Sequence, residues 1–550
     1  MQSVKEWLIK HRVNILAFLF YLILTIIAAW PVISNLNGVI IGQDNDVYNN
    51  IWVDWWTLKA LTDPQLSLWQ TNYILYPQGA NLIYHSFSHL TTLVSLSLRP
   101  FLGSLPAYNI TMLINIVLAG FSMFQLARYI TKSTTAGLLA GIVFAFNSHN
   151  IYQTAHPVLA AVWCFPWITL YFIKAIRENS IKYALVASIF VFLGAATSTI
   201  FIILIGMWLL FLVAYMFLAS EFPRPQWRIL LVFGIASFAL TLPLVFPLLR
   251  NAVTNQDGSF IIGPQNSIVT DIASPFVPHW YFWLTRGVYV GIVSAFLLLL
   301  AFGHQRRQAR LWFWVLILSF LLAIGPVPKI FNTELGVILP WSLPFAPILR
   351  NMYRMMILFS MGLSLLAAYG WLALESQLHT THVKTAVTAF LVGLLIFVEY
   401  TAAPFPATPA TVSAFYTDFL DTVPDNVVLA ILPTGRQEDK LYTFYQTFHN
   451  HPTVNGFIAR ANDTVFDFIY NNALLRAGAV NPQLEPSPIP TGALLDEALQ
   501  ELADINVGYL ILDKNLMAGE EVNTDIEEWR NALPMSPVYE DRLVLVYAIP

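Results

Sequence analysis

The chain has few charged residues and almost no cysteine. Of its 550 residues, 11% are Asp, Glu, Lys or Arg, and a single one, Cys164, is a cysteine. One cysteine excludes both a disulfide framework and a thiolate metal site. A charge content this low, beside 57% hydrophobic residues, is atypical of a soluble domain. We therefore expect a protein that is largely surrounded by lipid.

Several motifs of intracellular catalysis are also missing. The chain has no GxxxxGK phosphate loop, no GxGxxG that opens a helix, no HExxH zinc motif and no serine nucleophile elbow. It has no basic stripe of the kind that binds nucleic acid. We expect neither a nucleotide-sugar donor bound inside the cell nor a nucleic-acid partner.

Long apolar runs recur along the first 400 residues. Eleven of them suit membrane-spanning helices, although the run at 135–146 is short. The first run follows a basic start and lacks a cleavage site, which predicts a retained helix rather than a signal peptide. The runs cover residues 13–32, 108–130, 135–146, 158–173, 183–196, 200–218, 229–249, 288–302, 311–324, 355–374 and 383–400.

Basic residues are divided unevenly between the two ends of these runs. With the N-terminus in the cytoplasm, fourteen Lys and Arg residues fall on the cytoplasmic side and seven on the outer side, as the positive-inside rule requires. The long loops 33–107, 250–287 and 325–354 then lie outside, together with the C-terminal part. We expect a multi-pass plasma-membrane protein whose function lies on its outer face.

The C-terminal part differs in pattern from the rest. Residues 1–402 form the predicted membrane domain, 403–416 a linker rich in Pro, Ala and Thr, and 417–550 an extracytoplasmic domain. The apolar runs "NVVLAIL", "VGYLILD" and "LVLVYAI" predict strands, and "TGALLDEALQELADI" predicts a helix. This alternation is typical of a small α/β or α+β domain.

The first outer loop contains the segment "GQDNDVYNNIWVDWW" with Asp44, Asp46 and Asp54. Carboxylates at a membrane face are costly to desolvate, so such a cluster suggests chemistry or ion binding. A carboxylate at the dry end of an apolar bundle is expected to have a raised pKa and to be a better base. Asp46 has an alternative interpretation as a helix N-cap, and Asp54 as the polar face of a helix.

The same segment predicts an amphipathic helix at the membrane interface, with tryptophans as anchors at headgroup level. These are Trp52, Trp55 and Trp56.

Histidines recur in the outer loops. His85 and His89 have the i, i+4 spacing of one helical face, which favours a metal or phosphate contact, or ordinary hydrogen bonds at a cavity rim. His149 and His156 flank the second outer loop, where they could orient an acceptor, move a proton or contact a phosphate. Asp271 and His279 lie in the next large outer loop, and their spacing specifies no role; all six residues are candidate acceptor or phosphate contacts.

The segment "ILRNMYRMM" places Arg350 and Arg354 four residues apart at the outer start of a helix. Guanidinium groups match phosphate oxygens in two-point geometry, and a helix start adds N–H donors. The alternative is that both side chains reach for lipid headgroups. We expect these arginines and the early aspartates to converge on one pocket where lipid meets outer water.

On five segments the chain resembles the GT-C superfamily of membrane glycosyltransferases, particularly its bacterial YfhO-like and mannosyltransferase-like members. The segments are "GQDNDVYNNIWVDWW", "YPQGANLIYHSFSHL", "GIVFAFNSHNIYQTAHPVLAAVWCFPWITLYFI", "LRNMYRMMILFSMGLSLLAAYG" and "LPTGRQEDKLYTFYQTFHNHPTVNGFIAR". The resemblance implies a hexosyltransferase that moves a sugar from a polyprenyl-phosphate donor to a glycan, glycolipid or protein acceptor, with inversion.

In that superfamily an acidic residue of the first outer loop acts as base or contacts the acceptor, which corresponds here to Asp44 first and Asp46 second. Many members carry a further acid in the second outer loop. Residues 147–157 have none and offer only His149 and His156. This departure leaves a single-base mechanism or an inactive member, and it leaves a divalent metal as an open cofactor.

Two other functions remain open at this point. A lipid or polysaccharide transporter or flippase would usually show internal repeats and charges in mid-membrane, whereas the charges here concentrate in outer loops. A non-catalytic envelope scaffold would use the C-terminal domain for binding, and the missing second acid is compatible with it.

Overall fold

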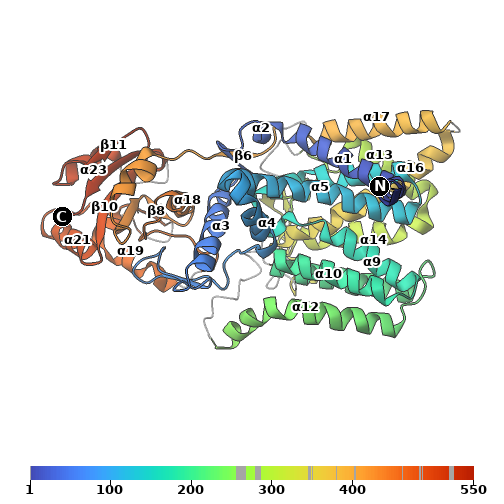
Figure 1. Ribbon diagram of the computed structural model, residues 1–550, viewed down its shortest axis with the longest axis horizontal. Coiled ribbons are helices and arrows are strands. Elements are labelled where there is room, and N and C mark those ends of the chain that lie inside the picture. The colour runs from blue at the N-terminus through green and yellow to red at the C-terminus, as the bar shows by residue number, and fades with distance from the viewer. Residues whose placement is uncertain are drawn as a thin grey trace.

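A computed structural model of the chain describes residues 2–254, 268–278, 286–344, 349, 351–378, 381–401, 404–460, 463–481, 485, 487–519 and 525–550. Two candidate residues, His279 and Arg350, lie outside the described residues. The molecule is elongated, with a bundle of long helices at one end and a lobe of short strands and helices at the other (Figure 1). Helices α3 and α4 lie between the two.

All eleven predicted apolar runs fall on helices, and the run at 158–173 is divided by a short break. In the described chain seven helical stretches are long and apolar enough to cross a membrane, and three shorter helices are also apolar. The bundle consists of α1 (Gln2–Ala28), α5 (Ser104–Thr131), α6 (Thr134–Phe146), α8 (Pro157–Ala160) with α9 (Cys164–Arg177), α10 (Ile181–Thr197), α11 (Thr199–Leu218), α12 (Trp227–Thr254), α13 (Ile292–His304), α14 (Arg306–Ala323), α16 (Met356–Leu378) and α17 (His382–Tyr400).

The outer helices of this bundle show apolar side chains to the surroundings. In the apolar stretch of α12 only 11% of the residues are buried, whereas 89% are buried in the stretch that contains α16. Phe238, Phe246 and Leu249 of α12 are more than half exposed. Apolar faces of this extent are stable in contact with lipid rather than water. The chain is therefore an integral membrane protein, with α16 in the centre of its bundle.

The C-terminal lobe is built on a four-stranded mixed sheet of order β11-β12-β10-β7. Strand β10 (Val507–Asp513) pairs in parallel with β7 (Val428–Leu432) and antiparallel with β12 (Val544–Ala548), which also pairs with β11 (Tyr539–Glu540). Helix α21 (Ala493–Asp504) buries Leu495, Leu499 and Leu502 in the lobe's core. The predicted strands and this predicted helix are confirmed.

Shorter elements complete the lobe. They are β6 (Ala407–Pro409), the π-helical turn η7 (Phe415–Phe419), η8 (Leu420–Thr422), β8 (Thr434–Gly435), α18 (Asp439–His449), η9 (Asp463–Phe466), α19 (Asp467–Asn471), α20 (Ala473–Ala477), β9 (Ala479–Val480), α22 (Lys514–Met517) and α23 (Ile526–Ala532).

The outer loops of the bundle form short elements of their own. The first contains α2 (Trp30–Ile33), β1 (Val39–Ile41), α3 (Asp46–Thr62), the hairpin of β2 (Gln70–Thr71) and β3 (Ala80–Asn81), and α4 (His89–Leu102). The second contains α7 (Ser148–Tyr152) and η1 (Gln153–Ala155), and the last contains β4 (Lys329–Ile330), β5 (Thr333–Glu334), η5 (Pro340–Ser342) and η6 (Met352–Met355).

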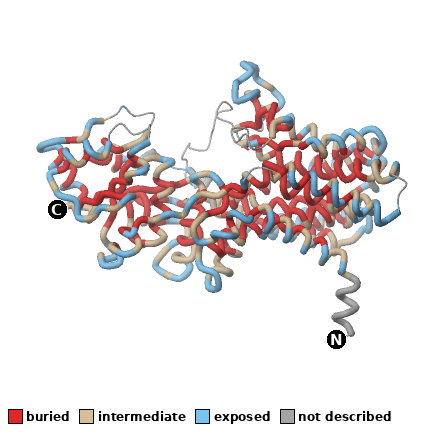
Figure 2. The backbone as a smooth tube through the Cα atoms, turned by 90° about the horizontal axis from the view of Figure 1, so that it is seen from above, coloured by how far each residue is buried: buried red, intermediate tan, exposed pale blue. Residues whose placement is uncertain are grey.

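The first outer loop is joined to the chain that leaves the bundle. Strand β1 pairs antiparallel with β6, so residues 39–41 and 407–409 form one small sheet. Asn109 of α5 accepts a hydrogen bond from the Ile41 N–H and donates to the carbonyls of Leu36 and Val39. Buried residues continue from the bundle through this junction into the C-terminal lobe (Figure 2). The loop and the lobe are thus held in register with the bundle.

The prediction of tryptophan anchors at headgroup level is wrong. Trp52 and Trp56 are fully buried and stack with parallel rings 5.9 Å apart, and Trp55 is nearly buried. The indole N–H of Trp52 donates to Gln446 of α18 (2.6 Å) and that of Trp55 to Asn450 (3.1 Å). Helix α3 therefore packs against the C-terminal lobe, a contact between segments some 400 residues apart that no local pattern encodes.

Candidate functional site

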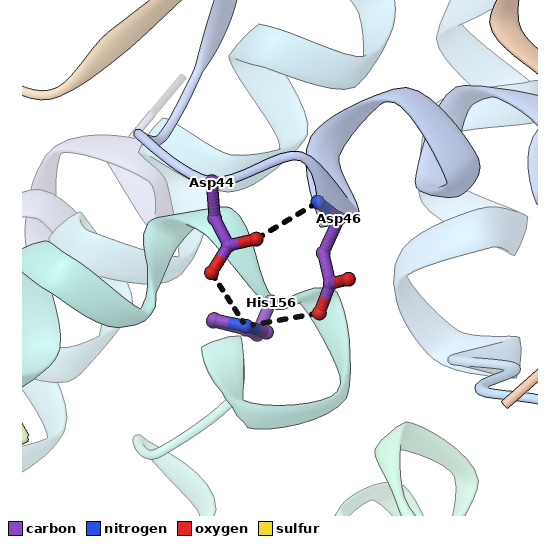
Figure 3. A group of neighbouring side chains, drawn as sticks. All are labelled: Asp44, Asp46 and His156. Atoms are coloured by element: carbon purple, nitrogen blue, oxygen red, sulfur yellow. Dashed lines mark hydrogen bonds and ion pairs between the residues drawn. The ribbon is translucent and has the colours of Figure 1, made fainter. Parts of the chain in front are cut away.

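Asp44, Asp46 and His156 meet at the end of the bundle that faces the lobe. The Nε2 atom of His156 is 3.2 Å from Asp46 Oδ2 and 3.9 Å from Asp44 Oδ2. Asp44 Oδ1 accepts a hydrogen bond from the backbone N–H of Asp46 (3.0 Å), which fixes the turn before α3. Figure 3 shows both carboxylates directed at the imidazole ring. The carboxylates are about one-third exposed, so a substrate can reach them.

The two loops that carry this cluster are pressed together. Gly42 has a φ of +104°, and a Cβ placed on it would lie 2.5 Å from the Cα of Ala155. Asn50, one turn into α3, donates its side-chain N–H to the carbonyl of Ala155 (2.9 Å). Since Ala155 precedes His156, these contacts set the imidazole beside the carboxylates.

A fourth charged group comes from the C-terminal lobe. The Nζ atom of Lys440, in the first turn of α18, lies 2.5 Å from Asp46 Oδ1. Lys440 is 5% exposed. Burial alone would raise the pKa of Asp46, but His156 and Lys440 outweigh it and hold that pKa well below its usual range. For Asp46 the expectation of a raised pKa is therefore wrong.

A cavity of about 340 Å³ is lined by Val158, two residues after His156, among others. Its wall is formed by the end of α10, the start of α11 and residues 244–248 of α12, which identifies it with the lobe-facing end of the bundle. Arg354 of η6, His85 and His89 also line it, as does Arg460 of the lobe. Of the paired arginines, Arg354 thus faces the cavity with both first-loop histidines.

His85 connects the cavity to the carboxylates. Its Nε2 is 3.3 Å from the amide nitrogen of Asn49, one turn after Asp46, and its Nδ1 accepts the N–H of Ala459 (3.2 Å). Burial lowers the pKa of His85 to about 4, although the charge of Asp46 acts in the opposite direction. His85 precedes α4 and His89 begins it, so the two do not share a helical face. Asp44, Asp46 and His156 are not among the residues that line the cavity.

His149 is fully buried in α7, and neither ring nitrogen has a hydrogen-bond partner in the described chain. Burial, with a smaller effect of His156, lowers the pKa of His149 to about 3, so its ring is neutral at physiological pH. The ring packs edge-on against Tyr353, 6.0 Å between centroids. It is not part of the Asp44–Asp46–His156 cluster.

Asp271 has a structural environment. Its two carboxylate oxygens accept the backbone N–H groups of Ala273 (2.8 Å) and Asn332 (2.7 Å). Because one oxygen accepts within the local turn and the other accepts from Asn332, the carboxylate ties residues 271–273 to the β4–β5 hairpin.

Asp54, which the pattern placed on a polar face, is 5% exposed. Burial raises its pKa to about 7, opposed by the hydroxyls of Ser95 and Thr92 and by Arg99.

Lys440 could not be predicted as a site residue from the sequence. It lies almost 400 residues from Asp46 in a lobe that carries far more acidic than basic residues. The one local sign is its place in "QEDKLY", a single lysine at the start of a helix rich in aromatic residues.

The Asp44–Asp46–His156 cluster has the arrangement of a metal-binding triad. One ligand atom from each side chain lies within 4.8 Å of the other two. Two carboxylates and an imidazole suit several divalent ions.

No protein-family model and no curated protein matches the chain. Similar solved structures exist. The arabinofuranosyltransferase AftD from Mycobacteria is 15% identical with a TM-score of 0.61 over 98% of this chain, and the chain spans only 40% of AftD. ArnT from Cupriavidus metallidurans is 12% identical with a TM-score of 0.56, covering 100% of this chain and 98% of ArnT.

A third similar structure is the oligosaccharyltransferase AglB from Archaeoglobus fulgidus. It is 12% identical with a TM-score of 0.50, over 93% of this chain and 70% of AglB. These neighbours are GT-C glycosyltransferases, so the predicted GT-C-like fold with a C-terminal strand-containing domain is confirmed. The YfhO-like branch stays a prediction.

Proposed function

We propose that the protein is a membrane glycosyltransferase that moves a hexose from a polyprenyl-phosphate donor to an acceptor of the cell envelope. One observation carries this proposal: a cavity partly walled by the lipid-facing helix α12 is lined by Arg354 and two histidines, and one of them, His85, contacts Asn49 of the helix that begins at Asp46. ArnT binds undecaprenyl phosphate, and AglB was solved with a dolichol-phosphate and a peptide. Their shared fold supports a lipid-linked donor here.

The donor would enter with its phosphate toward Arg354. Helices α11 and α12 contribute Ile200, Leu244 and Leu248 to the cavity wall. An apolar wall suits a prenyl chain, and guanidinium groups bind phosphate oxygens strongly in places shielded from water. Arg460 lines the same cavity from the lobe and adds a second positive charge on the phosphate side.

Transfer then requires a base for the acceptor hydroxyl. The acceptor oxygen attacks the anomeric carbon, the bond from that carbon to the phosphate oxygen breaks, and polyprenyl phosphate leaves with the bonding electrons. An attack from the face opposite the phosphate inverts the anomeric carbon. Asp44 is the better base, because Asp46 already forms an ion pair with Lys440. A positioned base typically accelerates such a step about 10²–10⁴-fold.

The proposed function also requires a particular orientation of the protein in the membrane. The N-terminus and the short basic loops would lie in the cytoplasm, and the site and residues 417–550 would face outward from the plasma membrane. The acceptor would be a glycan, glycolipid or protein held between the first outer loop and the lobe. His156 would orient the acceptor hydroxyl between the two carboxylates.

The test uses the purified full-length protein in lipid nanodiscs with a panel of radiolabelled polyprenyl-phosphate sugars. Donor binding and donor consumption are measured separately. Wild type should bind and consume at least one donor, Arg354→Gln should bind it more weakly, and Asp44→Asn should bind but not consume it. A panel without binding or consumption, together with an unaltered cellular phenotype of Asp44→Asn, would contradict the enzyme and favour an envelope scaffold.

A further inference from the structure

One of the two carboxylate charges of the Asp44–Asp46–His156 triad is compensated within the protein itself. Two carboxylates lie close together at the lobe-facing end of the bundle, and like charges this near repel each other unless a cation compensates them. In a metal-binding triad that cation is the ion. Here an ammonium group is already in contact with one of the carboxylates, since Lys440 Nζ is 2.5 Å from Asp46 Oδ1.

Both oxygens of Asp46 are in use. Lys440 contacts Oδ1, and the Nε2 atom of His156 lies 3.2 Å from Oδ2. A divalent ion would need a carboxylate oxygen and the same imidazole nitrogen as ligands. It would therefore have to break the contact of His156 with Asp46, and it would also lie close to a positively charged ammonium. The donor set has the spacing of a metal site but not its electrostatics.

The position of Lys440 is fixed from several sides. Its Nζ donates to Gln437 Oε1 (2.7 Å) and lies 4.8 Å from the centre of the Phe457 ring. The ring face is a favourable surface for a cation. The start of α18 is held by the neighbouring Asp439, whose carboxylate accepts the N–H groups of Gly435 (3.1 Å) and Gly456 (3.0 Å). A buried lysine held in this way cannot move aside for a metal ion at low cost.

We propose that Lys440 is a tethered cation that takes the place of a divalent metal ion at this triad, so that the protein binds no metal there. The lysine acts through Asp46 as a positioning residue. It neutralises that carboxylate, keeps it hydrogen-bonded to His156 and leaves Asp44 as the free carboxylate. The C-terminal lobe is then an essential part of the site, because it supplies this charge. The metal-binding part of the inference does not rest on the proposed glycosyl transfer.

The test measures Mn²⁺ binding to the full-length protein by electron paramagnetic resonance, which requires no turnover. Four proteins are compared: wild type, Lys440→Met, Lys440→Arg and the control Lys514→Met. Lys514 forms an ion pair with Glu540 within the lobe, so its loss removes a similar contact elsewhere. We expect wild type, Lys440→Arg and Lys514→Met to bind no Mn²⁺ at the triad. Lys440→Met should bind one equivalent, which Asp46→Asn in the same chain should abolish.

Two results would overturn the proposal. One is a stoichiometric Mn²⁺ site in wild type that Asp46→Asn removes. The other is a folded Lys440→Met protein that binds no Mn²⁺. Should Lys440→Met fail to fold, the comparison of wild type with Asp46→Asn decides alone. Where donor turnover is measurable, it should be unchanged by EDTA in wild type. A loss with EDTA would also overturn the proposal, whereas absence of turnover would count only against the glycosyl transfer.

Discussion

Gly42 of the first outer loop touches Ala155 of the second so closely that no side chain fits between them. A Cβ on Gly42 would lie 2.5 Å from the Cα of Ala155, well inside van der Waals contact. The backbone of Gly42 also has a φ of +104°, which residues with a side chain rarely adopt. This contact decides how near His156 can come to Asp44 and Asp46.

Gly42→Ala should therefore separate the loops and impair the site. A displacement of about 1 Å at a catalytic group can reduce turnover about 100-fold. We expect a reduction of that order in donor consumption, with donor binding in the Arg354 cavity largely kept. The control is Gly103→Ala, because Gly103 has a φ of +85° but no atom near its Cβ position. Equal losses in both variants would show that backbone strain, and not the loop contact, is responsible.

Asp44 and Asp46 should respond differently to replacement by Asn. The amide oxygen introduced by Asp44→Asn can still accept the N–H of Asp46, so this variant should lose turnover about 10²–10⁴-fold with unchanged thermal stability. Asp46→Asn leaves the buried Lys440 without its counter-ion, so it should lower the unfolding temperature as well as turnover. Thermal unfolding in detergent and donor consumption measure the two effects. A stable Asp46→Asn protein would contradict the ion pair.

Stability should depend on pH through Asp54. The folded protein holds the Asp54 proton up to about pH 7, whereas an unfolded chain releases it near the ordinary pKa of 3.8. Between these values the folded state binds more protons, so its free energy of unfolding falls as the pH rises. The complete effect is about 4 kcal/mol for this buried group, as an order of magnitude.

Asp54→Asn imitates the protonated carboxyl and should flatten this fall between pH 4 and 8. Denaturant unfolding at a series of pH values measures it. Asp63→Asn is the control, because Asp63 is the residue that follows the last turn of α3. In the described part of the chain its side chain accepts the N–H of Gln65, and Asn can accept it as well. An identical pH profile for wild type and Asp54→Asn would be incompatible with a raised pKa at Asp54.

The bundle and the strands of the lobe could be predicted because their signals are local. Apolar runs of membrane length predict helices, and short apolar runs bounded by turn residues predict strands, whatever these elements pack against. Asp44, Asp46 and His156 could also be predicted as candidate site residues, because ionisable groups at the end of an apolar bundle are costly to desolvate. Their mutual contact could not, as it depends on the meeting of Gly42 with Ala155.

The docking of the lobe on the bundle could not be predicted from local sequence patterns. The sequence around Trp52 predicts a membrane anchor. In the structure its ring is buried against α18, where Gln446 accepts a hydrogen bond from the indole N–H. The same docking brings Lys440 to Asp46 and Ala459 to His85. In each pair the two residues are more than 370 positions apart. From the local sequence alone, each side chain has an ordinary interpretation that does not involve its partner.

Gln446→Leu should test whether this docking maintains the site. The Gln446 side chain accepts the indole N–H of Trp52 (2.6 Å) and donates to the carbonyls of Tyr73 (2.5 Å) and His451 (2.9 Å). Leucine has a similar volume but removes the partner of the Trp52 indole N–H and of the His451 carbonyl, at about 1–3 kcal/mol each. The Tyr73 carbonyl keeps the N–H of Thr453. We expect a lower unfolding temperature and faster proteolysis between bundle and lobe.

Because the docked lobe carries Lys440, weaker docking of the lobe in Gln446→Leu should also lower turnover. Donor binding should fall less, since most of the wall of the Arg354 cavity belongs to the bundle and its outer loops. Thr447→Val is the control on the same helix, because among the residues that the structure describes its hydroxyl bonds to the carbonyl of Phe444 within α18 and to no part of the bundle. If Gln446→Leu retained full turnover while protease released the lobe, the site would not need the lobe, and the assignment of Lys440 to it would be wrong.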